Sequence, residues 1–328
     1  MSEKIEKLVE IKDKEWEKVD KWNKNITEEF LEQEQLSPQT LKQYKSALRQ
    51  FFYWVYENCD NKPLHELKVR DALKYQNYLI KRGLSSSAVK LKRSVVSSLC
   101  GFMETYYDDE FPMFKNIFNK KVPGVPNSFK REKKPLIKDE LENLIKELKK
   151  RKEWQMLAYL VFSYESGARR GEVSQVRKEI IDYDYVKDKK GNKKDYYMTH
   201  TVRGKGKGRE GKKIELFFSD DSKKVIKKWL DVRGDDDCEY LFVKKNSNGD
   251  VEQVTLETFN YWCSKTFSEI VGREVYPHLL RTSRASGLFH DGSSVKSISA
   301  LLGHKQTSTT EIYIIQDDSD LIDDIFDH

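Results

Sequence analysis

Residues 276–313 read YPHLLRTSRASGLFHDGSSVKSISALLGHKQTSTTEIY, and their pattern of apolar residues, proline and glycine predicts three short helices. Pro277 suits the first turn of a helix, because that position needs no backbone N–H donor, and Gly292 is a natural stop. A second helix is expected from the serine pair that follows to Gly303, since glycine adopts the left-handed conformation that ends many helices. The stretch therefore predicts an α-helical setting for its polar side chains.

A third short helix is expected where Ser308 and Glu311 have the spacing of a capping box. It would carry the tyrosine at the end of the stretch. Residues three apart on a helix share a face, so the histidine and arginine of the HLLR segment would project together. Four polar side chains are thereby gathered: His278, Arg281, His304 and Tyr313.

Two upstream segments carry further cations. Arg169 and Arg170 stand between an expected helix end and an expected helix start, where a planar guanidinium can grip a phosphate with two hydrogen bonds. Residues 203–209, RGKGKGR, predict a glycine-rich basic hairpin tip that can approach a polyanion closely. Short strands are expected at residues 180–185, 196–202 and 214–218.

Attack on a phosphodiester would use these side chains together. The phenol of Tyr313 needs help to lose its proton, because an unperturbed tyrosine has a pKa of about 10, and His278 is the candidate general base. Lys205 would protonate the leaving oxygen. Charge developing on the phosphoryl oxygens would be stabilised by Arg169, Arg281 and His304. A covalent phosphotyrosine stores the bond energy for religation, so no ATP is expected. No carboxylate cluster with metal-ligand spacing accompanies these residues, so no metal cofactor is expected either.

The distribution of charge favours an anionic ligand. The 328 residues include 60 Lys and Arg against 54 Asp and Glu, so the net charge is only +6. Residues 120–152 contain 12 basic and 5 acidic residues, whereas residues 311–328 contain 7 acids and no Lys or Arg. Basic segments beside an acidic tail suggest a polyanionic ligand and a separate docking element.

Cysteine usage and hydropathy exclude several other classes. The four cysteines stand far apart, which fits neither a zinc ribbon nor a disulfide framework. The N-terminus is charged, and no run approaches the roughly 18 apolar residues that a membrane span needs. The sequence therefore predicts a cytoplasmic protein, associated with the nucleoid if prokaryotic, that has no membrane segment.

Residues 37–118 predict a small helical domain. Ser37 followed by Pro38 is a strong helix start, and further helices are expected near residues 70–82 and after Ser85. A proline-containing basic linker follows. Basic residues of these segments and of the hairpin are the expected contacts to phosphates, with a plain solvated surface as the alternative for each: Lys42, Lys45, Arg49, Lys90, Arg93, Lys130, Arg131 and Lys207.

These residues resemble the tyrosine recombinase family, which includes lambda-type phage integrases and Xer-like recombinases. The family's T-G-x-R-x-x-E box looks like residues 166–172, SGARRGE, with Ser replacing Thr and Arg169 at the catalytic arginine. Its H-x-L-R box looks like residues 278–281, and its L-G-H with a nucleophile nine residues later looks like residues 302–304 and Tyr313. The family's catalytic lysine corresponds to Lys205 when counted from the preceding strand. Counted back from the following strand, it is Lys207.

The resemblance covers about residues 37–316 and implies a mainly α fold with a small antiparallel β-sheet. A helical core-binding domain would precede an α+β catalytic domain. The expected organisation is an N-terminal charged helix or arm at 1–36, a helical core DNA-binding domain at 37–118, a basic linker at 119–135, a catalytic domain at 136–316 and an acidic C-terminal tail at 317–328.

The resemblance also implies a function. A site-specific recombinase would cleave and rejoin DNA strands through a 3′-phosphotyrosine and a Holliday junction, with chemistry like that of type IB topoisomerases. The expected partners are double-stranded recombination sites, other copies of this chain in a tetramer on two sites, and an accessory DNA-bending or directionality factor. The acidic tail would dock in cis or in trans. Integration or excision of a mobile element is slightly favoured over Xer-like resolution of replicon dimers.

Two other classes stay open. A non-catalytic architectural relative would bind DNA without forming a covalent adduct, so trapping such an adduct decides against it. A metal-dependent nuclease would use His278, His290, Asp291 and His304. Cleavage that persists in EDTA would exclude the nuclease.

Overall fold

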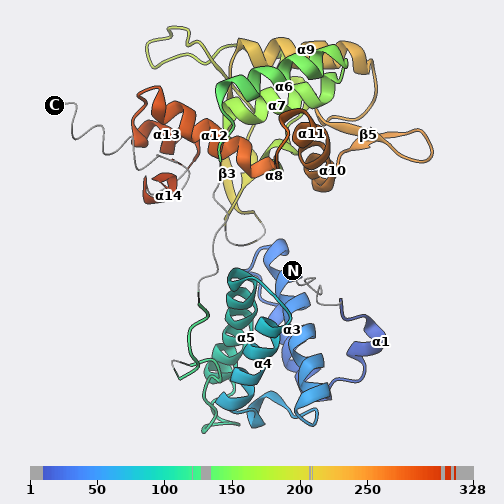
Figure 1. Ribbon diagram of the computed structural model, residues 1–328, viewed down its shortest axis with the longest axis vertical. Helices are drawn as coiled ribbons and strands as arrows, with labels where there is room; N and C mark the ends of the chain where they lie inside the picture. Colours follow the sequence, from blue (N-terminus) through green and yellow to red (C-terminus); the bar gives the residue numbers. More distant parts are fainter. Residues whose placement is uncertain are drawn as a thin grey trace, which may run out of the picture. The chain divides into compact units, whose positions relative to one another are not determined.

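The computed structural model describes residues 10–119, 121–126, 134–206, 208, 210–303, 307–311 and 314. These residues form a mainly helical fold with small antiparallel sheets of two strands each, as the sequence predicted (Figure 1). The chain divides into two compact units. The first comprises Met1–Arg131 and Gly206–Glu210, and the second comprises Glu132–Lys205 and Gly211–His328.

Helices build the first unit: α1 (Asp13–Trp16), α2 (Lys21–Leu31), α3 (Pro38–Asn58), a 3₁₀ turn (Leu64–Glu66), α4 (Val69–Lys81) and α5 (Ser86–Tyr106). Helix α3 begins as expected, because Ser37 accepts a hydrogen bond from the backbone N–H of Thr40 at 3.2 Å. Helix α5 begins in the same way, with Ser85 accepting from Ala88 at 3.3 Å. Both caps confirm starts that the sequence predicted.

Helix α2 belongs to the core of the first unit. Ile26 and Phe30 are buried, together with Asn23, whose side chain bonds to the carbonyl of Lys62 at 2.9 Å and to the N–H of Leu64 at 2.8 Å. Helix α2 lies within the charged helix or arm expected at 1–36, and it is part of the core of the first unit rather than a separate arm. The charged residues of α2 cover one face of the helix only. The buried residues recur every three or four positions and form the opposite face, which packs inward.

The second unit contains the helices α6 (Lys138–Lys150), α7 (Trp154–Ser166), α8 (Arg170–Val173), α9 (Asp220–Arg233), α10 (Leu256–Tyr261), α11 (Ser268–Val271), α12 (Pro277–His290), α13 (Val295–Leu301) and α14 (Thr307–Glu311). A 3₁₀ turn covers Lys178–Asp182 and a π-helical turn covers Trp262–Phe267. Helix α7 is apolar almost all round and packs against α6, α9 and α12, which lie in the same unit (Figure 1). Such a helix must be central, since every face needs to be buried.

Strands are short and pair in hairpins: β1 (Tyr197–Met198) with β4 (Phe217–Phe218), β2 (Val202–Gly204) with β3 (Lys212–Ile214), and β5 (Val243–Lys245) with β6 (Val251–Gln253). The hairpin around residues 203–209 is thus confirmed in its strands. A strand at 180–185 was wrong, because this segment opens with a 3₁₀ turn that buries Ile180. The β5–β6 hairpin was not predicted.

The described part of residues 276–313 folds largely as expected. Helix α12 begins at Pro277, and α13 is capped by Ser294, which accepts from the N–H of Ser297 at 3.1 Å. Gly303 ends α13 with a φ of 66°. Helix α14 begins at Thr307, so Ser308 lies inside the helix rather than at its cap, and the capping-box prediction was wrong.

No helix within the described ranges is both long and apolar enough to cross a membrane.

Candidate active site

Arg281 lies at the centre of the candidate site. It is only 1% exposed, on the buried face of α12. Its Nη1 donates to the carbonyl oxygen of Gly167 at 2.6 Å, and its Nη2 donates to the carbonyl oxygen of Leu302 at 2.8 Å. The side chain therefore ties together the segments that hold the SGARRGE and LGH motifs, because Gly167 precedes Arg169 and Leu302 follows α13 directly.

Gly167 allows this arrangement. It ends α7 with a φ of 59°, a conformation that favours glycine, and a Cβ atom there would lie 2.5 Å from Cδ2 of Leu302. The close approach of Gly167 to α13 brings both carbonyl oxygens within reach of one guanidinium. A permanently charged group buried in this way is costly unless it is well hydrogen-bonded.

Arg169 is held by Glu172. Its Nη1 donates to Glu172 Oε1 at 2.9 Å, and its backbone N–H donates to Oε2 at 2.8 Å. The carboxylate is nearly buried, with 4% of its side chain exposed, whereas 28% of the Arg169 side chain is exposed. Glu172 thus fixes the arginine while the arginine remains partly open to solvent.

Lys205 follows β2 directly and is exposed. Gln175 holds β2 in place, since its Oε1 accepts from the N–H of Arg203 at 2.9 Å and its Nε2 donates to the carbonyl of Arg203 at 3.0 Å. Lys212, in β3, donates through Nζ to the carbonyl oxygen of Gly303 at 2.8 Å. These bonds join the hairpin to the segment after α8 and to the end of α13.

His278 lies in the first turn of α12 and is exposed. The turn is stabilised by Thr282, whose hydroxyl donates to the carbonyl of His278 at 3.2 Å. His278 and Arg281 share the helix, as the three-residue spacing predicted, but they differ in setting. The histidine is at the surface, and the arginine is in the interior.

Three residues predicted for the catalytic centre or its hairpin lie outside the described residues: Lys207, His304 and Tyr313. The neighbours of Tyr313 are placed, however. Thr310, in α14, is buried and donates to Ser299 Oγ at 2.9 Å, and Ile314 packs against the cluster that contains Ala285 of α12 and Ile298 of α13. Helix α14 is therefore anchored close to the two helices that hold Arg281.

Glu172, Gln175 and Lys212 were not predicted as site residues. Glu172 had a signal in the sequence, because it closes the SGARRGE box. Gln175 and Lys212 had none, since each acts on a backbone group that is far away in the chain. Among the residues that the structure describes, no three His, Cys, Asp or Glu side chains are grouped closely enough to hold a metal ion.

The basic residues predicted to contact DNA fall into two groups in the first unit. Lys42, Lys45 and Lys90 are exposed. Arg49 is ion-paired with Asp13 at 2.8 Å and stacks over Trp16 at 5.3 Å. Lys130 and Arg131 lie outside the described residues.

Arg93 differs from the exposed lysines. It donates to the carbonyl of Pro123 at 2.9 Å and stacks over Phe118 at 5.5 Å, and burial lowers the pKa of its guanidinium. Arg49 and Arg93 therefore already bind partners within the protein. A residue that only contacts DNA phosphates would not need such partners.

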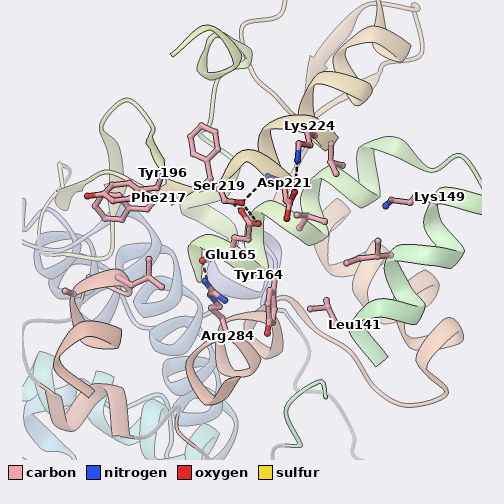
Figure 2. A pocket seen from close by; sticks show the side chains of 16 residues that line it. Leu141, Lys149, Tyr164, Glu165, Tyr196, Phe217, Ser219, Asp221, Lys224 and Arg284 are labelled. Atoms are coloured by element: carbon pink, nitrogen blue, oxygen red, sulfur yellow. Dashed lines mark hydrogen bonds and ion pairs between the residues drawn. The ribbon is translucent and has the colours of Figure 1, made fainter. Parts of the chain in front are cut away.

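The second unit also contains an apolar groove of about 990 Å³ (Figure 2). Helices α6, α7, α9, α12 and α13 and strand β4 line it. Within it, the Glu165 carboxylate accepts from Ser219 Oγ at 2.7 Å and from Ser222 Oγ at 2.5 Å, which anchors the start of α9. Arg284 donates to the carbonyl oxygen of Glu165 at 3.2 Å. Its guanidinium also lies over the ring of Tyr164.

Comparison with known proteins agrees with this geometry. The phage integrase family matches residues 134–320, and the phage integrase N-terminal SAM-like domain matches residues 25–110. The SPbeta prophage-derived recombinase-like protein YomM of Bacillus subtilis (strain 168) is 34% identical over 310 residues, which are 93% of this chain and 90% of that protein. The tyrosine recombinase XerA of Thermococcus kodakarensis is 29% identical, over 87% of this chain and 88% of its own.

A solved structure, a lambda integrase tetramer bound to a Holliday junction, is similar in fold, with a TM-score of 0.61 at 16% identity over 90% of this chain and 76% of that one. It shares the helical N-terminal domain and the α+β second domain. The matched family covers more than half of the chain, including every box that surrounds Arg281. The chain therefore belongs to the phage integrase family and is a tyrosine site-specific recombinase.

Proposed function

We propose that Tyr313 attacks a DNA phosphodiester and forms a 3′-phosphotyrosine, which a 5′-hydroxyl then reverses to rejoin the strands. Arg169 and Arg281 stabilise the charge on the phosphoryl oxygens, with His304 as a further donor. His278 acts as general base for the phenol, and its exposed position in α12 leaves its ring accessible to a bound substrate. The burial of Arg281 between Gly167 and Leu302 is the observation that carries this proposal.

The burial matters because charge stabilisation is strongest where the donors are fixed and water is excluded. Arg281 is oriented by two backbone carbonyls, so its plane does not have to be ordered when the substrate arrives. Arg169 has a different kind of support, the carboxylate of Glu172. Two arginines held in fixed directions can do here what a divalent cation does in many phosphoryl-transfer enzymes.

We assign the general acid to Lys205 rather than Lys207. Lys205 directly follows β2, whose position Gln175 fixes through both backbone groups of Arg203. A lysine next to a strand that is held in this way is better oriented than one further into the tip. Lys205→Ala and Lys207→Ala, assayed for cleavage in parallel, separate the two assignments, because only loss of the general acid should slow departure of the 5′-oxygen.

The experiment that tests the function is trapping of a covalent protein–DNA adduct on nicked duplex DNA from the element that encodes the protein. Wild type should form the adduct, and Tyr313→Phe should form none while still binding DNA. Tyr261→Phe is the matched control, since Tyr261 is 60% exposed and lies outside the site. A wild-type protein that binds DNA and never forms the adduct would be an architectural relative instead.

We also propose that the first unit binds double-stranded DNA through its exposed lysines, Lys42, Lys45 and Lys90, followed by the linker residues Lys130 and Arg131. Arg49 and Arg93 then contribute mainly to folding, because each is already engaged by an aromatic ring and a polar partner. Lys207 would add a phosphate contact from the hairpin tip. We propose the same division of labour for the domains, with DNA binding in the first unit, whose core includes α2, a linker within 119–135 and catalysis in 136–316.

Oligomerisation is proposed to use the apolar groove of the second unit. The tail at 317–328 combines six acids with Leu321, Ile322, Ile325 and Phe326, and the groove combines apolar walls with three cations, Lys149, Lys224 and Arg284, and two acids, Glu165 and Asp221. The apolar residues of the tail of one copy would therefore pack against the apolar walls of the groove of the next copy. The tetramer bound to a Holliday junction in lambda integrase provides a fitting precedent.

A mixing experiment tests this docking. A tail-truncated protein and a groove variant such as Val225→Glu should each recombine poorly alone, and their mixture should regain activity if docking is in trans. Docking within one chain predicts no recovery. If an accessory DNA-bending or directionality factor is needed, purified protein and DNA alone should not recombine.

For the biological role we favour integration or excision of a mobile element. The prophage-derived relative supports this at 34% identity over 93% of the chain, whereas the Xer relative is 29% identical over 87%. Sequencing the DNA joined to trapped adducts gives the target site. A site at the boundary of a mobile element supports the role, and a site on a replicon that resolves its dimers supports the Xer-like alternative.

A further inference from the structure

The end of α13 is held by two cations from different parts of the chain. The last carbonyl groups of a helix have no partners inside the helix. Here the carbonyl oxygen of Leu302 accepts from Arg281 Nη2, and the next one, that of Gly303, accepts from Lys212 Nζ, both at 2.8 Å. Two consecutive carbonyls are thus bound immediately before His304.

Lys212 reaches this turn from the β2–β3 hairpin. It is the first residue of β3 and lies opposite Gly204 in the antiparallel register, and Gly204 directly precedes Lys205. Its bond to Gly303 spans 91 residues of sequence. One side chain therefore connects the strand pair that bears the proposed general acid with the turn that leads to His304.

The local structure of the hairpin sets the direction of Lys212. Successive residues of a strand point to opposite faces, so Lys213 is directed away from Lys212, and it is exposed. Gly211 adopts a φ of 65°, and a Cβ atom there would lie 2.6 Å from the carbonyl oxygen of Gly204. This close packing of the two strands fixes the backbone from which Lys212 extends.

We propose that Lys212 is a positioning residue, which holds the Gly303 turn, directly before His304 in the sequence, against the β2–β3 hairpin. The inference rests on the proposed roles of His304 and Lys205. A lysine suits this task because an ammonium carries three donors and bonds strongly to a carbonyl at a helix end. Without it, the Gly303 carbonyl loses this donor, and the turn loses this tie to the hairpin.

The variant that tests the proposal is Lys212→Met, which keeps the length of the side chain and removes its donors. Lys212→Arg keeps a cationic donor, and Lys213→Met is the matched control on the opposite face. On nicked DNA that carries the mapped cleavage site, Lys212→Met should form the covalent adduct about tenfold to a hundredfold more slowly than wild type, since small misplacements of catalytic groups have effects of this size. Lys212→Arg should recover most of the rate, and Lys213→Met should match wild type.

A second measurement separates positioning from other roles. In a His304→Ala background, Lys212→Met should slow adduct formation little further, because the group that it positions is gone. The proposal is overturned if Lys212→Met slows adduct formation by the same factor in the His304→Ala background as in wild type. A fall of about one in the slope of log affinity against log salt also overturns it, because that result would make Lys212 a phosphate-binding residue instead.

A third measurement does not depend on activity. Hydrogen–deuterium exchange of the amides at residues 302–306 should be faster in Lys212→Met than in Lys213→Met or wild type. Unchanged exchange overturns the inference, and if Lys212→Met does not fold, Lys212→Gln is measured in the same way. Absence of any adduct with wild type contradicts the proposed function, while the exchange experiment still decides whether Lys212 holds the turn.

Discussion

Arg281 Nη1 donates a 2.6 Å hydrogen bond to the carbonyl oxygen of Gly167, a residue 114 positions earlier in the chain. The bond brings the end of α7 and the interior of α12 together beside Arg169. A single guanidinium thus organises two segments that carry proposed catalytic groups, so changes to it or to its neighbours should alter cleavage.

Replacing Arg281 with alanine should reduce the rate of adduct formation by roughly 10²–10³, the usual effect of removing one fixed donor to developing charge. DNA affinity should change little, since in the proposed mechanism this arginine contacts one phosphate among many that the protein neutralises. Rates on nicked DNA and filter binding across a salt series measure the two quantities. Equal reductions of cleavage and of binding would contradict the role assigned to Arg281.

Gly167→Ala should lower the free energy of unfolding by about 1–3 kcal/mol, because the residue is left-handed and its new methyl group would meet Leu302. Adduct formation should fall as well, since the Gly167 carbonyl orients Arg281. Gly171→Ala is the control, because a Cβ atom there meets nothing within 4 Å. Chemical denaturation of both variants checks this, and equal stability of the two would refute the steric argument.

Glu172→Gln should slow adduct formation by tenfold or more, because the buried carboxylate that orients Arg169 loses its charge. Removing one partner of a well-buried ion pair lowers the free energy of unfolding by up to about 3–5 kcal/mol. The loss of stability should be smaller here, because Arg169 is partly exposed. The control is Glu239→Gln, whose ion pair with Arg177 is exposed on both sides. Single-turnover cleavage with both variants provides the comparison.

Lys42→Ala combined with Lys45→Ala should weaken DNA binding on any sequence and should lower the salt slope by about 0.9 for each phosphate that the protein no longer neutralises. Lys18→Ala removes an exposed charge from the same unit and should leave the slope unchanged. Titrations at several salt concentrations measure the slopes. An unchanged slope in the double variant would show that Lys42 and Lys45 of α3 do not contact DNA phosphates.

Cleavage should persist in excess EDTA, because two arginines supply the charge stabilisation in the proposed mechanism. Adduct yield with and without chelator is the measurement. Loss of cleavage in EDTA that returns with added divalent metal would favour a metal-dependent nuclease using His278, His290, Asp291 and His304.

Local patterns in the sequence predicted much of the fold. Ser37 and Ser85 cap their helices as expected, and Gly303 ends α13, because caps and glycine stops depend on a few adjacent residues. The strand expected at 180–185 failed for a related reason. A short apolar run does not distinguish a strand from a buried turn. Helix α2 was misread because its charges concealed one apolar face.

The sequence alone determined the family, through the order and spacing of SGARRGE, HLLR and LGH with the tyrosine nine residues later. It also determined the start of α12, which carries HLLR, and the end of α13 at Gly303. Only the tertiary structure decided that Arg281 is buried against the Gly167 carbonyl and that Lys212 binds the Gly303 carbonyl. The physical reason is that spacing along the chain sets local conformation. Every residue has a backbone carbonyl, so the residue type at the accepting position does not reveal a hydrogen bond from a side chain about a hundred residues away.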